Sequence, residues 1–303
     1  MISTPELKQA RFGAPAAETA GAALARVLQA PSLRVLRGMD PQELTDNAAR
    51  AGFAPFGAVD GVVLPGQLVD VFDRGEQAPV PVLAGFNSGE IRSLRFLAPP
   101  APASPADYER VIRERYGDLA DEFLRLYPSS AMGESILASS RDALYGWTAE
   151  RLVRSQTAVG QPSFLYLFDH GYPAAEAAGL HGFHASELPY MFGMLDRTPP
   201  LWPKIPDTAE EAGLSAAMVD YWVSFARDGA PRAAHGPDWA AFGSSAAYMA
   251  FRDTPVQTAG LFPGMFALHE EAMCRRRASG SLAWNWNAGL ASPKLSGPVA
   301  GCG

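Results

Sequence analysis

The chain is poor in cysteine. Its 303 residues include only two, Cys274 and Cys302, which lie apart in the sequence. Two isolated cysteines have neither the close spacing of a metal site nor the number typical of a disulfide framework. Cys302 stands between two glycines near the C-terminus, where we expect a mobile tail. This cysteine usage favours a reducing compartment, so the expected localisation is cytoplasmic.

Long apolar runs and an excess of basic charge are also lacking. No stretch approaches the roughly 18 consecutive apolar residues of a membrane-spanning helix, and the first residues do not resemble a signal peptide. The net charge is -7, and the only tight basic run is Arg275–Arg277. That run fits the C-terminal end of a helix, where cations favour the helix dipole. We therefore expect neither a membrane span nor nucleic acid as a partner, since nucleic-acid binding requires a basic surface.

Motifs for cofactors are absent from the sequence as well. It contains no phosphate-binding glycine loop, no dinucleotide fingerprint and no HExxH pattern. His181, His184 and Glu187 are close enough in sequence to share a metal ion, but no further ligand candidates accompany them. The sequence therefore predicts neither a cofactor nor a metal site.

What the chain does contain is apolar material, 48% of its residues, arranged in clear periodic patterns. Continuous apolar runs predict buried strands at about 80–85 and 164–168, and a third strand is expected at 248–251. Helical spacing predicts helices at about 16–30, 108–126 with an interruption at Gly117, 134–158, 214–225 and 264–277, and a pair of helices at 33–52. Long helices with buried, parallel-type strands indicate the α/β class.

The organisation of this α/β chain is unusual. Only about three core strands serve the whole length, whereas a self-sufficient sheet usually has five or more. We expect one α/β domain over residues 1–277, followed by a Gly/Ser/Pro-rich tail over residues 278–303.

Two polar residues follow the predicted strands, at positions where α/β proteins hold functional groups. Glu90 lies in the loop after strand 80–85, and His184 lies in the segment after strand 164–168. A carboxylate followed by a histidine, in this order, forms two members of a hydrolase triad, in which the acid orients the histidine and the histidine acts as base. On position alone a surface role is the simpler interpretation of each, and His181 competes with His184. Glu187 reads as a helix-start or local hydrogen-bonding residue.

The serine of such a triad is the missing member. Residues 133–137, Gly-Glu-Ser-Ile-Leu, have the first half of a Gly-x-Ser-x-Gly elbow but end in leucine, and they lie in a predicted helix with no strand before them. Ser88 is too close to Glu90 for both to serve in one triad. No glycine-rich oxyanion segment occurs either.

Four blocks of the chain, in order, resemble the type-B carboxylesterase/lipase family, which includes cholinesterases and bacterial para-nitrobenzyl esterases. The first is Val-Asp-Gly-Val-Val-Leu-Pro at 59–65, and the second is the strand and loop ending in the Gly-x-x-x-x-Glu pattern of Gly85–Glu90. The third, residues 184–193, is similar to His-x-x-Glu-Leu-x-Tyr-x-Phe-Gly, and the fourth, residues 221–239, is similar to Tyr-Trp-x-x-Phe-Ala, Gly-x-Pro and a final Trp. The resemblance implies an α/β-hydrolase fold, a small-molecule ester substrate, no cofactor, and Glu90 and His184 as catalytic acid and base.

The chain departs from this family at its start. The family's oxyanion glycines and Gly-Glu-Ser-Ala-Gly elbow precede the Val-Asp-Gly block, and nothing before Val59 resembles them. We therefore expect the C-terminal portion of a serine esterase, inactive alone, whose edge strand is an exposed aggregation liability. One alternative is a split esterase completed by a separate N-terminal chain. Another is a non-catalytic binding module, although such a module would more often lose the histidine or glutamate than the sheet.

Overall fold

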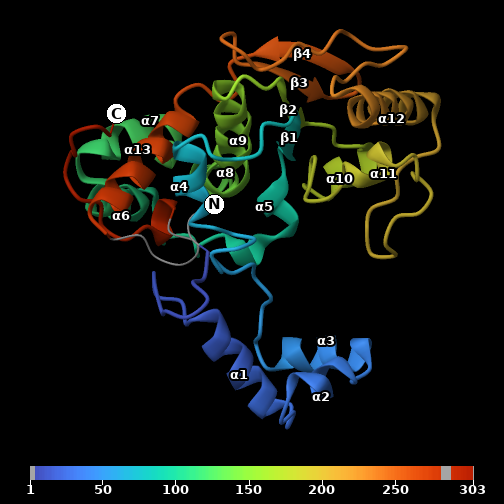
Figure 1. The fold of residues 1–303 in the computed structure, drawn as a ribbon. Coiled ribbons are helices and arrows are strands. Elements are labelled where there is room, and N and C mark those ends of the chain that lie inside the picture. The colour runs from blue at the N-terminus through green and yellow to red at the C-terminus, as the bar shows by residue number, and fades with distance from the viewer. Residues whose placement is uncertain (1–3, 281–287, 303) are drawn as a thin grey trace. The chain divides into compact units, whose positions relative to one another are not determined.

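The computed structural model describes residues 4–280 and 288–302, and these form two compact units (Figure 1). The first unit runs up to Glu76, and the second spans Gln77–Ser279 together with the last described residues. None of the helices in the described ranges is long and apolar enough to cross a membrane.

The first unit is helical. Its helices are α1 (Ala17–Val27), α2 (Leu33–Arg37), α3 (Pro41–Arg50) and α4 (Leu68–Asp73). Ser32 and Asp40 cap α2 and α3, because their side chains accept hydrogen bonds from backbone amides of the first turn. The helices predicted at 16–30 and 33–52 are confirmed.

Asp60 organises a turn within this unit. Its Oδ1 accepts hydrogen bonds from the backbone amides of Val62, Val63 and Leu64 at 2.9–3.0 Å. These amide donors lower the pKa of the Asp60 carboxyl. The Val-Asp-Gly block is thus an aspartate-centred turn that leaves the side chains of Val62 and Val63 exposed.

The second unit contains one four-stranded sheet and the remaining helices. The strands are β1 (Val82–Asn87), β2 (Ser163–Phe168), β3 (Ala247–Phe251) and β4 (Pro255–Ala259). The helices are α5 (Glu90–Ser93), α6 (Pro105–Tyr116), α7 (Ala120–Leu126), α8 (Met132–Arg141), α9 (Trp147–Ala158), α10 (Pro173–Ala177), α11 (Leu188–Met191), α12 (Ala209–Asp228) and α13 (Met265–Ala278).

The sheet has the order β1-β2-β3-β4, with β1, β2 and β3 parallel and β4 antiparallel to β3. Every residue of β2 is buried, as expected for a central parallel strand. Within the described part of the chain β1 pairs only with β2, so its other side is an open edge. The predicted α/β class with few parallel strands is confirmed, and β1 is an edge strand of the described sheet.

Helices cover both faces of this sheet (Figure 1). Side chains alternate along β2, so Phe164, Tyr166 and Phe168 share one face. They pack there in an aromatic core that includes Tyr221 of α12 and Phe251 of β3. On the opposite face α9 packs against β1 and β2. The central strands are therefore shielded from water by helices, and the functional loops must lie at the strand ends.

The predicted helix at 134–158 is interrupted. The chain is helical throughout, but α8 and α9 are joined by a π-helical turn, Asp142–Gly146. Such turns insert one extra residue and often occur where a helix carries functional groups. The break predicted at Gly117 is confirmed, because α6 ends there with a positive φ of 56°.

Two features correct the sequence analysis. Strand β4 was not predicted; it begins at a proline and carries polar side chains, so no apolar run marks it. The expectation of unpaired cysteines and a mobile Cys302 is also wrong, since Cys274 and Cys302 form a disulfide. The C-terminal segment packs further against α6, where the backbone amide of Leu295 donates to the carbonyl of Arg115 at 2.8 Å.

Candidate active site

Two loops meet at the carboxyl ends of β1 and β2. These strands are parallel neighbours, so the segments that follow them emerge at the same edge of the sheet. The backbone amide of Gly89 donates to the carbonyl of Gly182 at 2.7 Å. A Cβ at position 89 would lie 2.3 Å from the Leu180 carbonyl oxygen, so only glycine permits this approach. The close backbone contact fixes the loop after β1 against the loop that carries His184.

Glu90 and His184 meet at this junction. Nδ1–H of His184 donates to Oε2 of Glu90, which opens α5. The Glu90 side chain is buried, with 6% of its area exposed, whereas 42% of the His184 side chain is exposed. Among the described residues Nε2 of His184 has no hydrogen-bond partner. The pair is therefore a buried carboxylate that orients an imidazole whose outer nitrogen is available for proton transfer.

Asn87, the last residue of β1, ties both sides of the junction together. Its backbone amide donates to Oε1 of Glu90 at 3.0 Å, and its Nδ2 donates to the carbonyl of Phe183 at 2.8 Å. Nδ2 also donates to Oε2 of Glu187. Asn87 thereby fixes the acid and the segment bearing the histidine at once. Sequence reasoning missed it, although a polar residue at the end of a predicted buried strand was a usable signal.

The surroundings of the pair are partly buried and acidic. Burial raises the pKa of Glu187, and the negative charge of Glu90 adds to the rise, while the hydrogen bond from Asn87 opposes it. Tyr145, from the π-helical turn, lies with its ring 5.7 Å from the imidazole of His184. Burial and then the charge of Glu90 raise the pKa of Tyr145 to about 12, so this phenol stays protonated at neutral pH.

The competing residues lie elsewhere or serve other contacts. His181 is hydrogen-bonded to Glu176 at 2.7 Å, not to Glu90. Glu187 precedes α11 as its N-cap residue, which confirms the predicted helix start, but its carboxylate accepts a hydrogen bond from the distant Asn87 and not from a local donor. No group of residues suited to holding a metal ion occurs in the ranges 4–280 and 288–302.

The serine candidates do not reach the imidazole. Ser135 lies inside α8, where its buried hydroxyl donates to the carbonyl of Pro128 at 2.8 Å. Ser88 contributes its carbonyl to a hydrogen bond from Arg141. Neither hydroxyl makes a hydrogen bond to His184 in the described structure.

A second histidine, His269, belongs to a buried polar cluster that sequence reasoning missed. Its Nε2 lies 3.1 Å from the Tyr127 hydroxyl, which donates to Asp142 at 2.9 Å. Burial, helped by the charge of Arg276, lowers the pKa of His269 to about 3. Asp142 in turn is held by Arg141, whose Nε donates to its Oδ1 at 2.7 Å. The sequence offered no signal for this cluster, because its members come from the end of α7, the junction of α8 with the π-helical turn, and α13, which are far apart in the sequence.

We expect His269 to make the chain acid-sensitive. The unfolded chain protonates this histidine near its ordinary pKa of about 6.5, but the folded chain does so only near pH 3. The unfolded state therefore binds the extra proton between these values, so the free energy of unfolding falls as pH drops through that window. At pH 4.5 the loss is on the order of 2–3 kcal/mol.

Urea unfolding of the wild type and of His269→Gln at pH 7 and pH 4.5 measures this contribution. Glutamine cannot titrate, so the variant should lose less stability between the two pH values, whatever its stability at pH 7. An equal loss in both proteins would show that His269 is not the acid-sensitive group.

Comparisons with known proteins identify the family and the fold of the chain. The model of the Carboxylesterase family matches residues 9–263. Carboxylesterase 4A of Bos taurus is 25% identical over 209 residues, which are 63% of this chain and 37% of that protein. Fumonisin B1 esterase of Sphingopyxis macrogoltabida is 28% identical over 204 residues, 65% of this chain and 37% of that protein. The chain thus spans less than two fifths of the length of these relatives.

Solved structures show the same fold. EstA of Aspergillus niger superposes with a TM-score of 0.62 at 18% identity, covering 90% of this chain and 57% of that one. A PNB esterase superposes with a TM-score of 0.60 at 22% identity, covering 80% of this chain and 51% of that one. The chain accordingly forms part of an α/β-hydrolase fold.

Proposed function

Because the chain belongs to the carboxylesterase family, we propose that it supplies the acid and the base of a serine ester hydrolase. Glu90 is the proposed acid and His184 the proposed base. The hydrogen bond between Nδ1 of His184 and Oε2 of Glu90 carries this proposal, since it leaves Nε2 as the working nitrogen.

The proposed reaction follows from that arrangement. Nε2 of His184 takes the proton of a serine hydroxyl while the serine oxygen attacks the ester carbonyl carbon. The tetrahedral intermediate collapses, and the imidazolium returns its proton to the departing alcohol, leaving an acyl-serine. Water, deprotonated by the same Nε2, then releases the carboxylic acid and restores the serine. Glu90 holds Nδ1–H of the imidazole throughout and stabilises the imidazolium. This route requires no cofactor.

We propose that the serine and the oxyanion donors come from polypeptide outside the sequence given. No described serine hydroxyl bonds to His184, and Ser135 is committed to Pro128 inside a helix. The open edge of β1 supports this source, because an added strand would find unpaired backbone groups there, adjacent to the loop of Glu90. The added polypeptide could be continuous with this chain or a separate one.

Three samples test the proposal: the chain alone, the chain coexpressed with the polypeptide encoded immediately upstream, and a continuous fusion of the two. We expect no turnover of p-nitrophenyl butyrate by the chain alone, because an acyl-enzyme cannot form without a nucleophile. A sample containing the serine should reach a kcat within the usual range of about 1–1000 per second.

The controls separate the two sources of the serine. A chain that copurifies with its upstream partner and is active supports a split enzyme, whereas activity of the fusion alone supports one continuous polypeptide. Turnover by the chain alone that disappears in His184→Ala would contradict the proposal, because the nucleophile would then lie within this sequence.

A further inference from the structure

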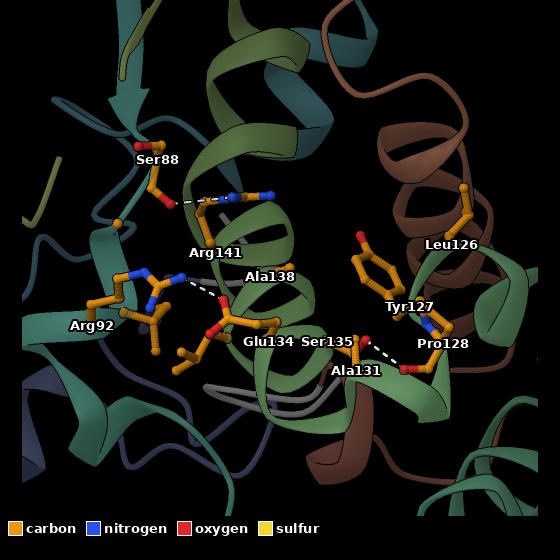
Figure 2. Close-up of a pocket in the computed structure, with 13 residues that line it drawn as sticks. Ser88, Arg92, Leu126, Tyr127, Pro128, Ala131, Glu134, Ser135, Ala138 and Arg141 are labelled. Atoms are coloured by element: carbon orange, nitrogen blue, oxygen red, sulfur yellow. Dashed lines mark hydrogen bonds and ion pairs between the residues drawn. The ribbon is translucent and has the colours of Figure 1, made fainter. Parts of the chain in front are cut away.

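A pocket of about 220 Å³ lies beside α8 near α5 (Figure 2). His184 is not among the residues that line it. Its walls come from the turn between β1 and α5, from the end of α7 and the segment after it, and from α8. Residues 88, 89, 91 and 92 line it, so the pocket borders the turn of Glu90 on both sides of that residue.

Two arginines give the pocket a cationic side. Arg141 is held by three contacts: its Nε donates to Asp142, its Nη1 donates to the Ser88 carbonyl at 3.2 Å, and its guanidinium lies 4.3 Å from the ring centre of Phe262. These contacts leave Nη2 without a partner among the described residues. Arg92 reaches the pocket from α5, with only 16% of its side chain exposed. Planar guanidinium groups held in this way match a carboxylate better than a flexible ammonium would.

The remaining wall is apolar. Ile91, Leu126, Leu137 and Ala138 line the pocket beside the arginines. A small inorganic anion would be hydrated on all sides and would gain nothing from these side chains. A ligand with a charged head and a short apolar tail satisfies both parts of the wall.

Glu134 occupies the cationic side in the described structure. Its carboxylate pairs with Nη2 of Arg92 across the pocket, as Figure 2 shows, yet 64% of the Glu134 side chain is exposed. An ion pair with one partner so exposed contributes little net stability, because water and salt screen it. A carboxylate from solution can therefore replace Glu134 at Arg92 at small cost, while Glu134 turns outward to water.

We propose that this pocket binds a short-chain monocarboxylate, with its carboxylate between Arg92 and Arg141 and its tail against Ile91 and Leu137. Glu134 acts as an internal competitor for the same guanidinium. The inference rests on the pocket alone and does not require that the chain hydrolyse esters, although such an acid is also what ester hydrolysis releases.

The test measures binding of n-butyrate to the full chain by isothermal titration calorimetry, with n-butyramide as the uncharged analogue. For a ligand of this size we expect a Kd on the order of 1 mM. Arg92→Gln should raise the Kd about tenfold by removing one charge-assisted contact. Glu134→Gln should lower it about threefold, because the competing carboxylate is gone. Arg113→Gln, an exposed arginine of α6 that pairs with Asp121, is the matched control and should leave the Kd unchanged.

The opposite changes in Arg92→Gln and Glu134→Gln distinguish a binding role from a structural one, since damage to the fold would weaken binding in both. Three results would overturn the proposal: no saturable binding of butyrate, binding that Arg92→Gln leaves intact, or binding of acetate and inorganic phosphate as tight as that of butyrate. The last result would mean a plain anion site in which the apolar wall has no part.

Discussion

In an enzyme that contains the serine, His184→Ala is expected to lower kcat by about 10⁴-fold or more, with little change in KM. The variant removes the only group that accepts and returns the serine proton, while the substrate contacts are left in place. Steady-state hydrolysis of p-nitrophenyl butyrate by the fusion or the two-chain complex measures the effect.

Two further variants show whether the loss is specific to the proposed pair. Glu90→Gln keeps the shape of the acid but removes its charge, so it should cost about 10³- to 10⁴-fold in kcat. His181→Ala changes a nearby, exposed histidine that bonds Glu176, and it should leave kcat within about twofold of the wild type. Comparable losses in His181→Ala and His184→Ala would mean that the fold of the loop, and not the base, had been tested.

The largest stability effect is expected at the centre of the aromatic core. Phe251 of β3 is fully buried, and its ring lies 5.6 Å from those of both Trp222 and Trp239. Phe251→Ala removes this packing and leaves a cavity, so the free energy of unfolding should fall by about 3–5 kcal/mol. Phe96→Ala makes the same chemical change at a side chain that is 81% exposed and should cost less than about 0.5 kcal/mol.

Urea titrations of both variants at neutral pH compare these values. A lower midpoint at unchanged slope identifies a loss of stability without a change in the unfolded state. Similar midpoints for Phe251→Ala and Phe96→Ala would mean that the aromatic cluster is not a tightly packed core.

Much of the fold could be predicted because the spacing of apolar residues along the chain follows from which side chains are buried. The run 164–168 is continuous and apolar, and β2 is buried at every residue. Strand β4 could not be predicted from apolar periodicity, because its residues are only partly buried and its first residue is a proline. The disulfide could not be predicted from the sequence, because its formation depends on how the C-terminal segment packs against α13. No local sequence pattern specifies that packing.

The same distinction applies to the site. Glu90 and His184 each follow a strand, and the parallel pairing of β1 with β2 is enough to bring their loops together. The choice between His184 and His181 was left open by position and was indicated only by family resemblance; in the structure Glu90 bonds His184 and His181 bonds Glu176. Asn87 and the His269 cluster depend on side-chain directions across several elements, which sequence spacing does not specify. The catalytic roles of the pair stay predictions until kinetics test them.

The parallel sheet also has a consequence for the order of folding. Val82 pairs with Ser163 and Leu165 pairs with Tyr248, so each parallel pairing joins residues about eighty positions apart. Closing loops of that length has an entropic cost, which slows the formation of the sheet. Contacts within α6 and α7 need no such closure and can form early. During refolding we therefore expect the backbone amides of α6 and α7 to become protected from hydrogen exchange before those of the sheet. Since Glu90 and His184 are 94 residues apart, their hydrogen bond should be among the last native contacts to form.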